Sequence, residues 1–182
     1  MTGLDFEFFC KLMLERSGLV LTPQKSYLVK SRLEPVMRSE GVTSVEALLT
    51  KIRSERPEPL IQACVNALAT HESYFFRDGT PFEHLVQSQL PALIAARRAT
   101  KRLRIWCAAC SSGQEPYSIA IILQEMSAKL PGWTLEVLGT DMSAPILEKA
   151  KSGFYSDFEV KRGLSPERLD LSLIHISEPT RR

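Results

Sequence analysis

A short apolar run enters a loop built only of small residues, and this arrangement limits the possible folds more than any other part of the sequence. The run over 103–109 is typical of a buried strand, and the six residues of 108–113 are all Ala, Cys, Ser or Gly. A helical pattern extends from Pro116 to Lys129, and a second strand is predicted over 134–138. Strand, helix and strand at this spacing predict a βαβ unit with parallel strands and a right-handed crossover.

The residues before this unit predict a bundle of four short helices over 4–69. Apolar residues at helical spacing precede Gly18, which is typical of a helix end. Thr43 and Glu46 have the spacing of a capping box at the start of the third helix. Pro57 begins a Pro-Glu-Pro stretch that separates the third helix from the fourth.

Composition and charge exclude several classes of protein. The 182 residues carry 23 Lys and Arg against 21 Asp and Glu, so the net charge is +2 and any basic surface must be local. On this ground we expect no nucleic-acid partner. We find no run of about 18 apolar residues and no signal peptide, so we expect a cytoplasmic protein without membrane insertion. Four cysteines are too few for a disulfide framework, and we expect free thiols.

The small-residue loop indicates either a ligand site or a plain tight turn. Small residues let the backbone approach a ligand, and a loop that leaves a strand and opens a helix is where doubly wound folds hold nucleotides. The loop has only Gly113, so it lacks the full dinucleotide fingerprint. Asp141, 28 positions later, follows the second strand. In doubly wound folds, a carboxylate at this place accepts hydrogen bonds from ribose hydroxyls. Asp141 is equally suited to cap a helix before Ser143, and it could do both.

Other residues near this loop have two interpretations each. Cys107 and Cys110 have the spacing of a zinc or redox pair, but no partner pair is visible, and we predict no metal site. Glu115 either complements the helix dipole or contacts a ligand. His71 is either a site residue or a solvent-facing group. Arg77 comes directly after three consecutive aromatic residues. An arginine beside buried aromatic side chains favours a carboxylate or phosphate partner.

Several motifs in the same order resemble the chemotaxis receptor methyltransferases, the CheR family. They are His71-Glu-Ser-Tyr-Phe-Phe-Arg77, the stretch over 104–120, Gly139-Thr-Asp-Met-Ser143 and the stretch over 147–155. The resemblance covers residues 4 to about 170. It implies an α/β protein, with a small all-helical domain over 1–70 and the first part of a Rossmann-like methyltransferase domain over 71–170. Residues 171–182 look foreign to the family, and we predict a non-native tail.

The resemblance implies transfer of a methyl group from S-adenosylmethionine to glutamate side chains on chemoreceptor helices, which leaves S-adenosylhomocysteine. It implies that Arg77 is catalytic and orients the attacking carboxylate. A glutamate with a pKa near ~4.3 is already ionised at neutral pH, so the chemistry depends mainly on alignment and needs no base. The residues that the resemblance places against the cofactor are His71, Ser73, Arg77, Ala109, Gly113, Glu115 and Asp141.

Basic residues on or near one predicted helix suggest how the helical domain meets a receptor. They are Lys25, Lys30, Arg32 and Arg38. An acidic receptor segment would be attracted to such a face, and a solvated helix face with no partner is the alternative.

The chain also departs from the family. The family sheet has about seven strands, whereas 104–182 shows two clear ones. We therefore expect an uncovered sheet face, weak or no binding of S-adenosylmethionine by this polypeptide, and no turnover. Two other functions stay open. One is a non-catalytic signalling module with a degenerate cofactor half, and the other is a different nucleotide-binding enzyme.

Overall fold

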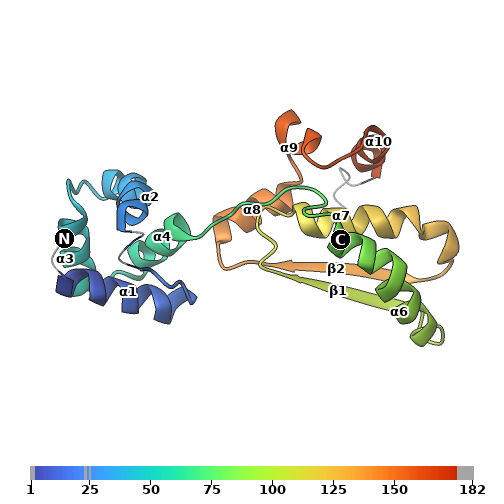
Figure 1. The fold of residues 1–182 in the computed structure, drawn as a ribbon, viewed down its shortest axis with the longest axis horizontal. Helices are drawn as coiled ribbons and strands as arrows, with labels where there is room; N and C mark the ends of the chain where they lie inside the picture. Colours follow the sequence, from blue (N-terminus) through green and yellow to red (C-terminus); the bar gives the residue numbers. More distant parts are fainter. Residues whose placement is uncertain (1–2, 23, 25, 176–182) are drawn as a thin grey trace. The chain divides into compact units, whose positions relative to one another are not determined.

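The computed structural model describes residues 3–22, 24 and 26–175, and it divides into two compact units between Thr70 and His71 (Figure 1). In those residues, no helix has both the length and the apolar character needed to cross a membrane. Each unit has a hydrophobic core of its own. An all-helical unit therefore precedes a unit that contains a sheet, which confirms the predicted fold class.

The first unit is the predicted bundle of short helices. Its helices are α1 (Gly3–Ser17), α2 (Ser26–Ser39), α3 (Val45–Glu55) and α4 (Glu58–Leu68). The side chains that form its centre are almost completely buried, and they include Phe9, Met13, Leu33, Leu48, Ile52 and Ile61. Helices this short gain most of their stability from packing an apolar face, because an isolated helix of this length is marginal in water.

The start of α3 differs by one residue from the prediction. The N-cap is Ser44, whose side chain accepts a hydrogen bond from the backbone N–H of Ala47 at 3.1 Å. The expected capping box of Thr43 and Glu46 is therefore wrong. Serine and threonine both cap well, so the sequence Thr-Ser does not say which of the two takes the position.

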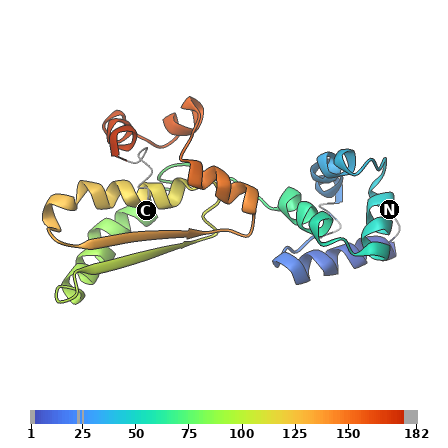
Figure 2. The same cartoon turned by 180° about the vertical axis from the view of Figure 1, so that it is seen from behind.

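The second unit contains the predicted βαβ unit and further helices. Strands β1 (Arg102–Ala108) and β2 (Thr134–Thr140) are parallel, with Leu103 opposite Leu135 and Ala108 opposite Thr140. Helix α7 (Gln114–Glu125) connects them and runs along the sheet in both views (Figures 1 and 2). The remaining elements are α5 (Thr80–His84), the π-helix η2 (Leu85–Gln89), α6 (Leu90–Ala96), the 3-10 helix η3 (Ser127–Lys129), α8 (Ala144–Ser152), α9 (Asp157–Lys161) and α10 (Pro166–His175).

One face of the sheet is covered and the other is not. Leu103 and Cys107 of β1 pack in the core with Ile122 of α7. On the opposite face, the side chain of Trp106 is 66% exposed and that of Leu138 is 46% exposed. Because successive side chains of a strand point to opposite faces, this alternation leaves an open sheet face, as expected from the sequence.

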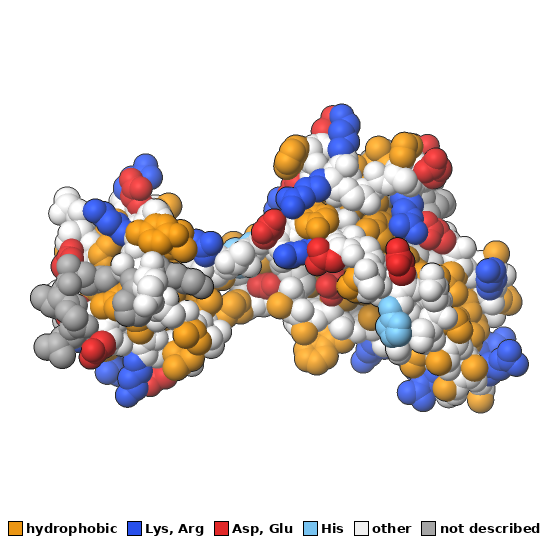
Figure 3. All heavy atoms as spheres, viewed as in Figure 1, with side chains coloured by type: hydrophobic (Ala, Val, Ile, Leu, Met, Phe, Trp, Pro, Cys, Tyr) orange, Lys and Arg blue, Asp and Glu red, His pale blue; other side chains and the backbone are white. Residues whose placement is uncertain are grey.

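Charges of both signs cover the second unit, and its described part ends in a helix. Figure 3 shows acidic and basic side chains interspersed over the second unit, in keeping with a net charge of +2. Helix α10 continues to His175, so part of the predicted tail over 171–182 is helical. Residues 176–182 lie outside the described residues.

Candidate functional site

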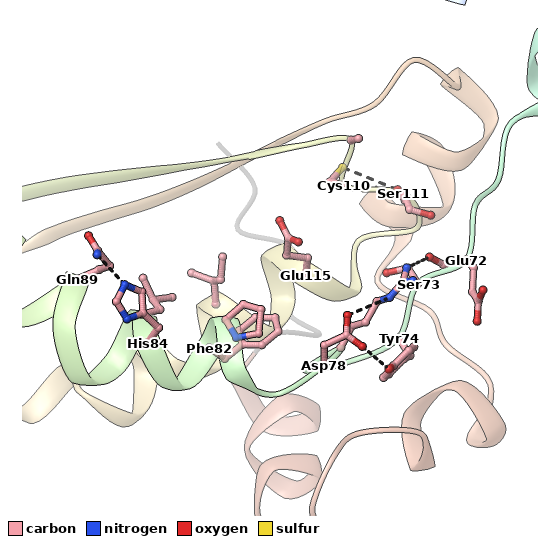
Figure 4. A pocket seen from close by; sticks show the side chains of 15 residues that line it. Glu72, Ser73, Tyr74, Asp78, Phe82, His84, Gln89, Cys110, Ser111 and Glu115 are labelled. Carbon is pink, nitrogen blue, oxygen red and sulfur yellow. Dashed lines mark hydrogen bonds and ion pairs between the residues drawn. The ribbon is translucent and has the colours of Figure 1, made fainter. Parts of the chain in front are cut away.

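A cavity of about 440 Å³ lies in the second unit, between the aromatic-arginine segment over 71–78 and the start of α7 (Figure 4). Segments far apart in the sequence form its walls, and Glu115 projects into it from the first turn of α7. The predicted site residues that line it are Ser73, Arg77, Ala109 and Glu115. Polar and apolar side chains that were not predicted also line it, among them Glu72, Tyr74, Asp78, Phe82, His84 and Gln89.

Arg77 is held at this cavity by its own segment. Its Nη1 donates a hydrogen bond to the backbone oxygen of Glu72 at 2.8 Å, and its Nε lies 3.7 Å from a carboxylate oxygen of Asp78. A guanidinium group has five N–H donors, so these contacts leave donors for an anionic group in the cavity. The guanidinium also lies 5.9 Å from the ring centroid of Tyr74.

The loop after β1 has a left-handed backbone at two residues that line the cavity. The φ angle is 56° at Ala109 and 50° at Ser111, although neither residue is glycine. The amide of Cys110 donates to the backbone oxygen of Thr140 at 2.9 Å, so the loop still follows β2. Non-glycine residues in this conformation persist only where surrounding contacts hold them, and such residues concentrate at functional sites.

Asp141 joins the loop after β1 to the loop after β2. One carboxylate oxygen accepts the N–H of Ser111 at 2.8 Å, and the other accepts the N–H of Ser143 at 3.0 Å. The N-cap residue of α8 is Ser143, so the alternative that Asp141 is the cap is wrong. Asp141 is not part of the cavity lining, and contact with a ribose stays a prediction.

Gly113 and His71 do not line the cavity. A β-carbon on Gly113 would lie 2.8 Å from the hydroxyl oxygen of Tyr155 and 3.0 Å from the β-carbon of Ala150, and its φ is 95°. Packing and backbone conformation therefore both require glycine at position 113. Contact of Gly113 with the cofactor stays a prediction. His71 contributes its backbone oxygen, which accepts the hydroxyl of Ser111 at 3.1 Å.

Two hydroxyl groups that sequence reasoning missed support the site. The hydroxyl of Tyr155 donates to the backbone oxygen of Ser112 at 2.7 Å, and its ring packs edge-on against Phe75 with a centroid distance of 5.0 Å. Burial raises the pKa of Tyr155, so the phenol keeps the proton that it donates. The hydroxyl of Ser118 accepts the N–H of Phe76 at 2.9 Å. Tyr155 is the last residue of the family motif over 147–155, and this position is the feature of the sequence that could have indicated its role.

Cys107 and Cys110 are buried free thiols, and Cys110 lines the cavity. Burial, assisted by the nearby carboxylate of Glu115, raises the pKa of Cys107 to about 12. Burial and the carboxylate of Asp141 also raise the pKa of Cys110. Within the described residues, no cluster of three or more His, Cys, Asp or Glu could hold a metal ion. The two sulfurs act here as small apolar groups that fill space.

We expect Cys107 to resist alkylation in the folded chain. The thiolate is the reactive form, and burial lowers both its population and its access to reagent. At pH 8, iodoacetamide should modify Cys107 at least about a hundredfold more slowly in the folded chain than in urea. Half-buried Cys10 is the matched control and should react faster than Cys107. Mass spectrometry of peptides measures both rates, and equal rates at Cys10 and Cys107 would contradict a buried neutral thiol.

Of the predicted basic face of the first unit, Arg32 has hydrogen-bond partners inside the unit. The guanidinium of Arg32 donates to the backbone oxygen of Leu68 at 2.6 Å and to the hydroxyl of Thr70 at 3.3 Å. Arg32 therefore caps the end of α4, where a cation stabilises free carbonyl groups, and its part in a receptor-binding face stays a prediction. Lys30 and Arg38 are exposed on α2. Lys25 lies outside the described residues.

Comparison with known proteins extends over nearly the whole chain. The family model described as CheR methyltransferase, all-alpha domain, matches residues 4–69, and the model described as CheR methyltransferase, SAM binding domain, matches residues 71–179. The second match passes residue 170, where the resemblance was expected to end. Whether the tail is native stays a prediction.

Curated proteins of the same kind are similar to this chain. Chemotaxis protein methyltransferase 1 of Pseudomonas aeruginosa is 43% identical over 168 residues, which are 91% of this chain and 61% of that protein. The protein of the same name in Vibrio cholerae is 39% identical over 90% of this chain and 59% of its own length. The chemotaxis protein methyltransferase of Escherichia coli is 36% identical over 93% of this chain and 56% of its own length. The chain thus spans about six tenths of the length of these relatives.

Proposed function

The chain belongs to the CheR methyltransferase family, and from that premise we propose that it takes part in methyl transfer to glutamate side chains of chemotaxis receptors. Its second unit is the family's S-adenosylmethionine-binding domain. The observation that carries the proposal is that Arg77 and Glu115, from separate segments, line one cavity together with Ser73 and Ala109.

The residues of this cavity fit the cofactor. S-adenosylmethionine has a carboxylate at one end and carries positive charge on its amino and sulfonium groups. Arg77 offers N–H donors to a carboxylate, Glu115 offers an anion to a cation, and Ala109 has only a methyl side chain to obstruct close approach. A cavity of about 440 Å³ is also within the usual size of small-molecule sites.

The protein's part in the reaction is to bind and align. When bound, S-adenosylmethionine supplies an electrophilic methyl group. The receptor carboxylate is ionised at neutral pH, so no residue of this chain has to remove a proton. Arg77 orients the attacking carboxylate or the amino-acid end of the cofactor, and Asp141 holds the loop over 109–113 in place while it offers its remaining lone pairs to ribose hydroxyls.

A chimera tests the proposal directly. We expect the 182-residue polypeptide alone to bind S-adenosylmethionine weakly, because one face of its sheet is exposed. Residues 1–170 can instead replace the matching part of the Pseudomonas aeruginosa relative, which is 43% identical. The chimera should transfer radiolabelled methyl groups from S-adenosylmethionine to receptor glutamates. A folded chimera that binds receptor without transferring methyl groups would favour the non-catalytic signalling module.

In that chimera, Arg77→Ala should lower the rate of methyl transfer about thirtyfold. The arginine makes charge-assisted hydrogen bonds to an anionic group, and such bonds contribute about 1.5–3 kcal/mol. Arg77→Lys should recover only part of the rate, because an ammonium group lacks the planar fork of a guanidinium. Arg98→Ala is the control, since Arg98 is exposed and lies outside the cavity lining. A parental rate in Arg77→Ala would show that Arg77 does not orient either reactant.

We further propose that the exposed basic residues of α2 attract an acidic receptor segment. Lys30 lines a small groove on α2 with Tyr27 and Glu34, and Arg38 lies 3.6 Å from Glu34. Glu34 offsets part of the positive charge, so the attraction is modest.

Reversing both charges, Lys30→Glu with Arg38→Glu, should weaken receptor binding about fivefold and reduce its dependence on salt. Surface plasmon resonance at two ionic strengths measures both effects. The control is Lys11→Glu, an exposed change on α1. Unchanged affinity of the double variant for the receptor would show that the basic residues of α2 are solvated and do not contact the receptor.

A further inference from the structure

Backbone strain is concentrated at the cavity. In the described residues, the non-glycine residues with positive φ include Phe76 at 52°, Asp78 at 65°, Ala109 at 56° and Ser111 at 50°. Asp78, Ala109 and Ser111 line the cavity, and Phe76 lies directly before Arg77, which also lines it. A left-handed backbone is least favourable for a bulky side chain, so Phe76 needs an external contact to stay in it.

That contact comes from Ser118 of α7. The N–H of Phe76 donates to the hydroxyl oxygen of Ser118 at 2.9 Å, and the same hydroxyl donates to the backbone oxygen of Gln114 at 2.7 Å. Donation to Gln114 fixes the hydroxyl proton and leaves a lone pair for Phe76. The side chain of Ser118 is completely buried, so water does not compete with it as an acceptor for the N–H of Phe76. This serine is thus the acceptor that holds Phe76 in its unfavourable conformation.

The same bond connects the segment that carries Arg77 to the helix that carries Glu115. Ser118 lies three residues after Glu115, so the two share one side of α7. On the facing segment, Phe76 is followed by Arg77, whose guanidinium bonds to the backbone oxygen of Glu72 at 2.8 Å. A change of φ at Phe76 would therefore move Arg77 relative to Glu115.

We propose that Ser118 is a positioning residue, whose hydroxyl holds the left-handed backbone of Phe76 and thereby sets Arg77 opposite Glu115. This inference rests on the proposed function, because it assigns the arrangement to cofactor binding. The ring of Phe76 has contacts of its own, with a centroid distance of 5.2 Å to Phe82 and 4.1 Å to the guanidinium carbon of Arg168. Loss of the hydroxyl therefore releases the backbone of the segment and leaves the ring packed.

Hydrogen exchange of the 182-residue chain, measured by NMR, tests the placement without any ligand. The Phe76 amide should be protected, and Ser118→Ala should make it exchange about tenfold faster. Ser17→Ala is the matched control, because the hydroxyl of Ser17 also donates to a backbone oxygen four residues earlier, that of Met13 at 2.6 Å, and accepts a backbone N–H. An unprotected Phe76 amide in the unaltered chain overturns the proposal even if Ser118→Ala fails to fold.

A titration of the chimera with S-adenosylhomocysteine tests whether Ser118 acts through Arg77. Ser118→Ala should weaken binding about tenfold, and less than twofold when Arg77→Ala is already present. An equal loss in both backgrounds would show a general structural role and overturn the proposal. If the unaltered chimera shows no binding at millimolar ligand, the proposed cofactor site itself fails. The exchange measurement then still decides whether Ser118 holds Phe76.

Discussion

Replacement of Gly163 by alanine is expected to unfold the second unit of this chain. A β-carbon at this position would overlap the backbone oxygen of Phe75 and lie 2.9 Å from its carbonyl carbon. The φ of Gly163 is also 106°, a conformation that side chains rarely adopt. Because the obstacle is backbone and cannot rotate away, the loss in free energy of unfolding should reach about 4 kcal/mol or more.

Tryptophan fluorescence measures this effect selectively, since Trp106 and Trp133 both belong to the second unit. The matched control is Gly132→Ala. Gly132 has a φ of 75°, but the nearest atom to an added β-carbon is the flexible end of Lys101 at 3.7 Å, so the change should cost only about 1 kcal/mol. Equal urea midpoints for the two variants would show that the contact with Phe75 has no energetic weight.

The close approach of Gly163 to Phe75 is one of several contacts between the segment after α8 and the aromatic-arginine segment, which forms one wall of the cavity. The guanidinium of Arg162 bonds to Glu72 at 3.2 Å and lies 4.2 Å from the ring centroid of Tyr74. Arg168 stacks on Phe76 and forms two hydrogen bonds to Glu125 at 2.8 and 3.1 Å. The segment after α8 therefore fixes the aromatic-arginine segment against α7.

Periodicity and breakers predicted the local elements, because the physics that decides them is local. The parallel pairing of β1 with β2 followed from an apolar run, a loop of small residues and an amphipathic helix of the right length. The left-handed backbone of Gly113 was also visible in principle, since a lone glycine in such a loop is typical of that conformation.

The missed features depend on contacts between distant parts of the sequence. Arg32 binds the end of α4, 36 positions away at Leu68, and nothing near Arg32 in the sequence indicates that partner. Ser118 meets Phe76 across 42 positions. The hydroxyl of a serine inside a helix can donate to the carbonyl four residues earlier, whatever else it contacts. The second hydrogen bond, which the hydroxyl accepts from a distant residue, therefore cannot be recognised in the sequence.

Asp141→Ala should abolish most of the affinity for S-adenosylhomocysteine in the chimera. The carboxylate accepts the N–H groups of Ser111 and Ser143, and both of these residues are buried. Alanine leaves two buried donors without an acceptor and removes the oxygens expected to bind the ribose. We expect a loss of about 3–4 kcal/mol, which corresponds to a several-hundredfold higher Kd.

Asp141→Asn distinguishes the two parts of this role. Its single amide oxygen still accepts one N–H, whereas its amino group faces the other N–H, so the Kd should lie between those of the parent and Asp141→Ala. Asp157→Ala is the control, because Asp157 is an exposed acid of α9, 3.8 Å from Lys161. Isothermal titration calorimetry measures each Kd. A Kd of Asp141→Ala within about threefold of the parental Kd would show that the carboxylate joining the loop after β2 to the loop after β1 is not part of the cofactor site. The expected order of the three Kd values would place the ends of both strands at one ligand.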